Sequence, residues 1–211
     1  MTDFVIEIKD ISLMLKKEEI LSHISMSLKR GMIYGILGRN GSGKTMLMKC
    51  ICGFIPVTQG EIIVEGKKVG KDIDFPDSIR FILETPGFIP YYSGYKNLKI
   101  LADINRIAGK KEIEEALHIV DLFDAAKLPV RKYSLGMRQR LGLAQVIMER
   151  PNILLLDEPM NGLDKEGVLK MRNYLLELKK QGKTILLASH SVEDIRQLCD
   201  ATYELEHGRI I

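Results

Sequence analysis

The chain has 211 residues, of which 45% are hydrophobic and 28% are charged, the composition of an ordinary globular protein. This length suits one large domain or one domain with an inserted lobe. The formal net charge of +3 is small and no long basic run accompanies it, which argues against a nucleic-acid-binding protein, whose basic residues would cluster.

The first third of the chain is predicted to form antiparallel β structure that leads into a strand and a helix. Apolar and polar residues alternate at positions 4–8 and 24–29, which is typical of half-buried strands. An apolar run at 33–37 precedes a helix predicted at 45–51, and a loop then leads to a strand and turn at 61–67. The outer strands are expected to form a β lobe.

Three further apolar runs, at 79–83, 153–156 and 184–188, are predicted to be strands of a parallel sheet. Each is short and mostly apolar on both faces, as in strands that helices cover on both sides. Each is also followed by polar residues that are capable of chemistry, namely Glu84, Asp157, Ser189 and His190. Because ligands of open α/β sheets bind at the carboxyl ends of the strands, we expect four strand ends, including that of the run at 33–37, to converge on one site.

Helices are predicted on either side of the run at 153–156. The stretch at about 95–149 is mainly helical, and its first apolar face extends from Leu98 to Ala108. A further helix covers 164–181 and stops at a glycine. We therefore predict a single α/β domain over 1–211, with a mainly parallel core sheet, an N-terminal antiparallel β lobe and an inserted helical lobe at about 88–149.

A glycine-rich segment after the run at 33–37 matches the phosphate-binding pattern G-x-x-x-x-G-K-[ST]. Its residues are Gly38, Arg39, Asn40, Gly41, Ser42, Gly43, Lys44 and Thr45. The glycines let the backbone approach phosphate oxygens, and the N–H groups of the loop and of the following helix point at the anion. Lys44 is predicted to reach the β- and γ-phosphates of ATP, and Thr45 to hold Mg²⁺. The alternative is a chance glycine-rich turn, against which the flanking strand and helix argue.

Two adjacent acids, Asp157 and Glu158, follow the run at 153–156. Next to a phosphate loop, Asp157 fits the role of organising Mg²⁺, directly or through water. Glu158 is then placed to polarise the water that attacks the γ-phosphate. The alternative interpretation is a pair of solvated acids in a turn.

Together these motifs resemble the nucleotide-binding subunit of an ABC (ATP-binding cassette) transporter, over essentially the whole chain and in the order of the family. Three further segments carry the resemblance. The signature, usually Leu-Ser-Gly-Gly-Gln, is Tyr133-Ser134-Leu135-Gly136-Met137; the D-loop is Asn161-Gly162-Leu163-Asp164; and the switch histidine is His190.

The resemblance implies an ATPase with the P-loop NTPase fold of the ABC type and a mechanism that one chain cannot complete. In this family two subunits close head-to-tail on two ATP molecules, and the signature of one caps the γ-phosphate held by the other. Ser134 has a hydroxyl donor at a predicted helix start, and Gly136 permits close backbone approach, so both suit that role. His190 resembles the residue that positions the attacking water, and Asp164 is assigned to the nucleotide site. The other histidines, His23, His118 and His207, lie in no motif and are assigned no role.

The chain departs from the family pattern at three places. Leu135 and Met137 replace the first glycine and the glutamine of the signature. Glu84 stands where a Mg²⁺-contacting glutamine is usual, and a carboxylate also suits this cation, which prefers oxygen ligands. The aromatic residue that stacks on adenine in the family is replaced at Leu15, so we expect apolar contact and loose selectivity between ATP and GTP. The alternative is that this divergent loop is aligned wrongly.

The signature and Glu84 resemble in particular the branch that serves bacitracin, lantibiotic and drug export or immunity. No apolar run approaches the ~18 residues that span a bilayer, and the N-terminus shows no secretory signal. We therefore expect a cytoplasmic subunit, peripheral on the membrane, that works with a separate membrane permease and forms a homodimer when ATP is bound, without a nucleic-acid partner. The alternative is a soluble ABC-type ATPase that acts on ribosomes or DNA; a single cassette without sustained heptads favours the transporter.

Overall fold

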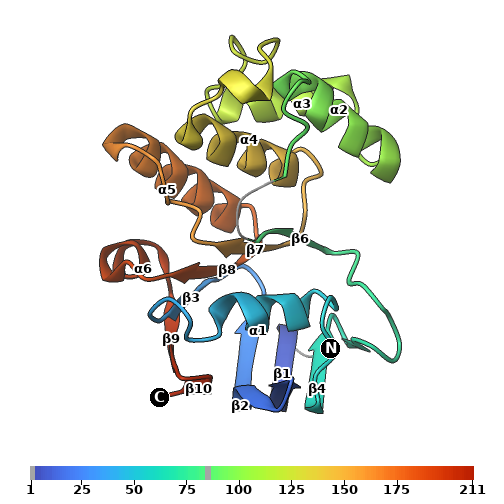
Figure 1. Cartoon of the computed structure of the whole chain (residues 1–211), viewed down its shortest axis with the longest axis vertical. Coiled ribbons are helices and arrows are strands. Elements are labelled where there is room, and N and C mark those ends of the chain that lie inside the picture. Colours follow the sequence, from blue (N-terminus) through green and yellow to red (C-terminus); the bar gives the residue numbers. More distant parts are fainter. Residues whose placement is uncertain (1–2, 84–86) are drawn as a thin grey trace. The chain divides into compact units, whose positions relative to one another are not determined.

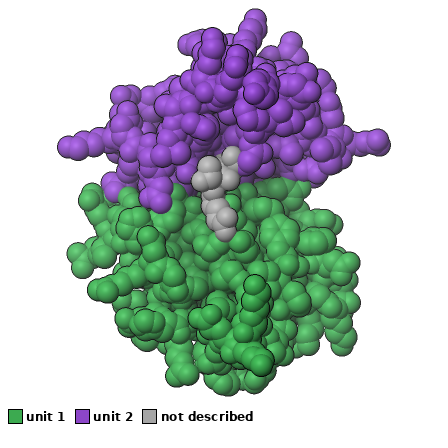
Figure 2. Space-filling view, viewed as in Figure 1, with its two compact units in different colours: residues 1–83, 152–158, 177–211 green, residues 84–151, 159–176 purple. Residues whose placement is uncertain are grey.

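The structure is a computed structural model, and it describes residues 3–83 and 87–211. The chain divides into two compact units, which Figure 2 shows in different colours. Unit 1 comprises residues 1–83, 152–158 and 177–211, and unit 2 comprises residues 84–151 and 159–176. The chain therefore leaves unit 1 twice, and the two segments at 84–151 and 159–176 together form unit 2.

Unit 1 contains a six-stranded sheet in the order β10-β9-β3-β8-β7-β6 (Figure 1). Its first five strands in the chain all run parallel, and β10 alone pairs antiparallel, with β9. The strands are β3 (Ile33–Leu37), β6 (Ile79–Ile82), β7 (Ile153–Asp157), β8 (Thr184–Ser189), β9 (Ala201–Glu206) and β10 (Arg209–Ile210). Every residue of β7 and β8 is buried, so the prediction of parallel strands with two covered faces is confirmed for these two. β6 is parallel as predicted, but it is an edge strand in which Phe81 is exposed, so the prediction of two covered faces is wrong there.

A second sheet of unit 1 is antiparallel and has the order β2-β1-β4-β5. Its strands are β1 (Phe4–Leu15), β2 (Glu18–Lys29), β4 (Gln59–Val64) and β5 (Lys67–Lys68). In β2 the residues Ile24, Met26 and Leu28 are buried, while their neighbours are at least partly exposed. The alternation in the sequence therefore predicted both the strand and its buried face.

Two helices of unit 1 pack on these strands. The first, α1 (Lys44–Ile51), begins one residue before the predicted start and buries Leu47, Met48 and Ile51. The second, α6 (Val192–Leu198), lies directly on β3: a Cβ at Gly35 would lie 2.8 Å from Ile195 Cδ1. A side chain at Gly35 would push this helix away from the strand that carries the phosphate loop.

Unit 2 is helical. Its elements are α2 (Gly94–Asn105), α3 (Lys110–Ile119), the short η1 (Val130–Lys132), α4 (Leu135–Ile147) and the part of α5 (Lys165–Lys180) up to residue 176. The apolar face predicted to reach Ala108 is wrong in its last turn, because α2 ends at Asn105 and Arg106 has a left-handed φ of 55°. Among the described residues, no helix combines the length and the apolar character needed to cross a bilayer.

Candidate functional site

The phosphate loop, residues 38–45, follows β3 and enters α1. Gly41 and Gly43 have φ values of 81° and 109°, in the left-handed region that side chains disfavour. A Cβ at Gly43 would also lie 2.9 Å from Leu21 Cδ2 of β2. No side chain caps the start of α1, so the N–H groups of its first turn remain available to an anion.

Lys44 folds back over this loop. Its side chain is only 6% exposed, and its Nζ donates hydrogen bonds to the carbonyl oxygens of Gly38 at 2.7 Å and Arg39 at 3.1 Å. The same nitrogen lies 3.8 Å from Glu158 Oε1. Phosphate oxygens carry charge and are stronger acceptors than peptide carbonyls, so a bound triphosphate can take over these bonds without the ammonium leaving the loop.

Thr45 and Asp157 form a pair of oxygen donors at the ends of two different elements. The Thr45 hydroxyl donates a hydrogen bond to Asp157 Oδ2, and Asp157 is 7% exposed at the end of β7. Carboxylate and hydroxyl oxygens are ligands that suit Mg²⁺. The predicted combination of these two residues is therefore sterically sound.

Glu158 and His190 meet at the next position along the sheet edge. The register pairs Asp157 with Ala188, and Glu158 N donates to Ala188 O at 2.9 Å. Glu158 has a left-handed φ of 50°, which costs roughly 1 kcal/mol for a residue with a side chain. His190 Nδ1 lies 2.9 Å from Glu158 Oε1. Because an ionised carboxylate only accepts hydrogen bonds, this nitrogen is the donor.

The signature segment lies in unit 2 at the start of α4. Ser134 is exposed and is the N-cap of this helix, and its Oγ accepts a hydrogen bond from Met137 N at 3.2 Å. That bond leaves the hydroxyl proton able to donate. Beside it, Tyr133 is buried and donates to Ala125 O at 2.8 Å; burial raises the pKa of its phenol. The buried Tyr133 therefore anchors the chain directly before Ser134, which is exposed to solvent.

The D-loop packs against the signature within unit 2. A Cβ at Gly136 would lie 2.9 Å from Gly162 O, and a Cβ at Gly162 would lie 2.8 Å from Leu135 Cδ2. Gly162 has a φ of 77°. Asp164 Oδ1 accepts a hydrogen bond from Gly167 N at 2.8 Å, the pattern of a cap on α5. Gly136 is therefore needed for close packing inside one chain, a reason that the sequence alone did not indicate.

The predicted site residues fall into two groups. Unit 1 brings together Lys44, Thr45, Asp157, Glu158 and His190, and unit 2 brings together Ser134, Gly136 and the D-loop. Leu15 is half-exposed at the end of β1, where it pairs with Glu18. The Mg²⁺ contact expected at Glu84 lies outside the described residues.

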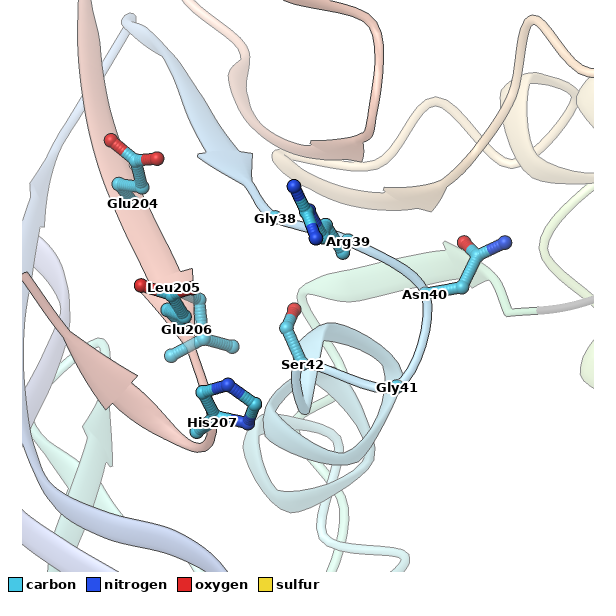
Figure 3. Close-up of a pocket in the computed structure, with 9 residues that line it drawn as sticks. All are labelled: Gly38, Arg39, Asn40, Gly41, Ser42, Glu204, Leu205, Glu206 and His207. Atoms are coloured by element: carbon cyan, nitrogen blue, oxygen red, sulfur yellow. The ribbon is translucent and has the colours of Figure 1, made fainter.

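A cavity that sequence reasoning missed lies beside the phosphate loop (Figure 3). It has a volume of about 300 Å³, and its walls are residues 38–42 of the loop and residues 204–207 of β9 and the turn that follows. Residues 204–207 form a wall of this cavity because β9 pairs parallel with β3, which places Glu204 next to Leu37. No feature of the sequence indicates that β9 pairs with β3.

Comparisons with known proteins point to one family. A family model described as "ABC transporter" matches residues 21–161. The chain is 44% identical to the uncharacterized ABC transporter ATP-binding protein YybJ of Bacillus subtilis, over 98% of this chain and 94% of that protein. It is 36% identical to the bacitracin transport ATP-binding protein BcrA of Enterococcus faecalis, over 99% of this chain and 68% of that protein.

A solved structure described as the ATP binding subunit of an ABC transporter superposes with a TM-score of 0.88, at 24% sequence identity. The superposition covers 98% of this chain and 88% of that chain. At this level of identity the likeness concerns the fold.

Proposed function

The chain belongs to the family of ABC transporter ATP-binding proteins, and on that premise we propose that it powers a separate membrane permease by ATP-driven closure of a dimer. Its activity as an ATP-binding ATPase follows from the family. The observation that carries the catalytic assignment is the cluster of Lys44, Glu158 and His190 at one sheet edge, beside Thr45 and Asp157.

Within this site Glu158 acts as the general base. Its carboxylate side chain is 19% exposed, which admits one water while the backbone holds the residue in a fixed orientation. His190 orients that carboxylate through Nδ1 at 2.9 Å, and Lys44 supplies positive charge where the γ-phosphate develops negative charge. Abstraction of a proton by Glu158 then turns the water into the nucleophile.

Mg²⁺ fits the oxygen pair of Thr45 and Asp157. When bound, the cation neutralises charge on the β- and γ-phosphates. The chain's contribution is to hold a hydroxyl and a buried carboxylate on adjacent elements, so that both are in place before the nucleotide arrives.

Closure of two subunits would complete the site. The helix start at Ser134 offers a hydroxyl proton and free backbone N–H groups to an anion, but the groups that hold phosphate lie in unit 1. We infer that Ser134 of a second copy caps the γ-phosphate, head-to-tail, and that the two copies are identical.

An exposed aromatic cluster in unit 1 suits the permease partner. Phe54, Phe75 and Phe81 are all exposed, and their rings lie together, with centroids 5.9 Å apart for Phe54–Phe75 and 4.9 Å for Phe54–Phe81. Clustered aromatic residues at a surface mark protein interfaces. In unit 2 Tyr91 is 75% exposed and adds a further contact for the same class of partner.

The similarity to a bacitracin transport protein supports a cargo of peptide antibiotics, exported or excluded for immunity. Membrane association at the cytoplasmic face would then come from the permease. This chain determines neither the cargo nor the direction of transport, because the permease makes the contacts with the substrate.

The test is affinity purification of the tagged chain from detergent-solubilised membranes of its native host. We expect a co-purifying polypeptide with several apolar spans of ~20 residues, lost in Phe75→Asp and retained in Leu169→Asp, an exposed residue of α5. Recovery of ribosomes or of a nucleic-acid-bound complex instead would contradict the transporter role and leave the ATPase activity intact.

A further inference from the structure

The cavity beside the phosphate loop is suited to a cation. Glu204 and Glu206 line it from β9, and Arg39 lines it from the loop. Both glutamates are exposed, and among the described residues none of these three side chains takes part in an ion pair. The imidazole of His207 also lines the cavity. Beside it, two carboxylates face one guanidinium, and this excess of acidic groups disfavours a phosphate group and favours a second cationic group.

A buried hydroxyl in the same cavity has no partner. Ser42 is 7% exposed, and its Oγ is the single buried side-chain polar atom of the described residues that lacks a hydrogen bond. In Figure 3 this hydroxyl points into the space between the phosphate loop and β9. Because buried polar groups are normally satisfied, the unpartnered hydroxyl indicates that a polar group enters this space, and its lone pairs can accept from a donor.

A guanidinium matches these acceptors. It is planar, carries five N–H donors and no acceptor, and can bind a carboxylate with two parallel bonds. The cavity of about 300 Å³ is large enough for one such group beside the Arg39 side chain. Its donors can bond to hydroxyl and carboxylate oxygens alike, and the cavity is lined by both kinds.

The surface around Ser134 offers one arginine that is available for this purpose. Arg138 N bonds to Ser134 O at 3.0 Å, so the two residues lie one helical turn apart on one face of α4. Arg138 is exposed and makes no side-chain hydrogen bond or ion pair in the described part of the chain. By contrast, Arg131 lies over the Tyr91 ring at 5.4 Å, and Arg140 donates to Val120 O and Asp121 O.

We infer that this cavity receives the guanidinium of Arg138 from a second copy of the chain when Ser134 of that copy reaches the phosphate loop. The inference rests on the proposed head-to-tail closure and names an ionic contact that fixes its register. Glu204 and Glu206 would hold the arginine beside the loop while Ser134, one turn earlier on the same helix, caps the phosphate. The contact occurs twice in a symmetric dimer, once at each nucleotide.

The test is charge reversal in a Glu158→Gln background, which we expect to retain ATP and to keep the proposed dimer assembled. Glu206→Lys or Arg138→Glu alone should each weaken ATP-dependent dimerisation, measured by sedimentation velocity, by roughly tenfold or more, because like charges then meet at the interface. Combining both reversals in one chain should restore most of the lost affinity. High salt should weaken the parent dimer and leave the single variants less affected.

Matched controls use charges outside the contact. Asp77→Lys changes an exposed acid at the amino end of β6, the edge of the sheet opposite the phosphate loop, and Arg131→Glu changes an arginine already engaged with Tyr91. Combining Asp77→Lys with Arg138→Glu, or Arg131→Glu with Glu206→Lys, should restore none of the lost dimer affinity. Thermal melts of each monomer establish folding, and Glu206→Gln replaces Glu206→Lys if the latter fails to fold.

The outcomes separate the two claims. If the parent Glu158→Gln protein forms no dimer with ATP, the head-to-tail closure itself fails. If the parent dimerises but Glu206→Lys and Arg138→Glu have no effect, or weaken it additively without rescue, the ionic contact is overturned and the closure stands. Rescue by Lys132→Glu in place of Arg138→Glu also overturns the assignment to Arg138.

Discussion

The two halves of the nucleotide site differ in how much each one contains. In unit 1, a hydrogen bond joins Thr45 to Asp157, and Glu158 contacts both Lys44 and His190. In unit 2, the signature offers a helix start, one serine hydroxyl and no catalytic side chain. In the proposed mechanism, the catalytic half is therefore assembled within one chain, whereas the signature acts on a phosphate that a second copy holds.

In the proposed mechanism, the groups that perform hydrolysis and the surface that permits it lie in different units of the chain. The strand ends of unit 1 are fixed by register, since neighbouring parallel strands bring their carboxyl ends to one edge. The start of α4 is fixed by local packing of Gly136 on Gly162. We therefore expect a subunit to bind ATP in unit 1 and still to need the signature of a second copy for hydrolysis.

Removing the base should have the largest effect. Glu158→Gln is expected to lower the rate of ATP hydrolysis by ~10²-fold or more while ATP binding persists, because the amide cannot take a proton from water. Phosphate release and nucleotide binding, measured separately, check this. Glu114→Gln, on the surface of α3, serves as the control and should leave both unchanged. An undiminished rate for Glu158→Gln would remove this residue as the base.

The signature serine offers a way to separate capping of the helix from capping of the phosphate. Ser134→Asp retains a good N-cap, so the free energy of unfolding should stay near that of the parent. The added negative charge would face the γ-phosphate, and hydrolysis should fall by roughly tenfold or more. Ser134→Ala should instead lose about 1 kcal/mol of stability. Full activity in Ser134→Asp would show that the serine does not approach the nucleotide.

Packing of the D-loop on the signature predicts a smaller effect, on stability. Gly162→Ala combines a left-handed φ of 77° with a Cβ 2.8 Å from Leu135 Cδ2, and we expect a loss of about 2 kcal/mol in urea unfolding. Gly182→Ala is the control, because Gly182 has a φ of 79° but no atom within 4 Å of its Cβ, so it should lose only about 1 kcal/mol. Equal losses would argue that the D-loop does not press on the signature.

The cysteines report on unit 1 alone and have no effect near neutral pH; theirs appears only in alkaline solution. Burial raises the pKa of the Cys50, Cys52 and Cys199 thiols from 9.0 to about 12. Between these values the unfolded chain has lost thiol protons that the native chain retains, so the free energy of unfolding should fall as pH rises from about 9 to about 12. Denaturant titrations at several pH values measure this slope. A Cys50→Ala/Cys52→Ala variant should have a shallower slope, and an unchanged slope would contradict the assignment.

Sequence reasoning predicted that the residues at the carboxyl ends of β3, β7 and β8 would lie together, as the contacts of Thr45 with Asp157 and of Glu158 with Lys44 and His190 show, because these residues sit in short motifs whose strand context is visible locally. The run at 153–156 with Asp157 and Glu158, and the loop ending at Lys44 and Thr45, are examples. It did not predict that β9 lies beside β3 and walls a cavity with Glu204, since a strand's partner is decided by tertiary contacts. The close approach of Gly136 to Gly162 was equally invisible, because it joins residues far apart in the chain.

The central claim, a nucleotide site shared between two copies, is tested most directly by mixing two inactive variants. Lys44→Ala removes the phosphate half and Ser134→Asp damages the capping half, so each homodimer contains two defective sites. A mixed dimer contains one site with Lys44 from one copy and Ser134 from the other. We predict that mixing restores ATP hydrolysis well above the sum of the separate variants. Activity that stays at that sum, with mixed dimers present, would contradict a shared site.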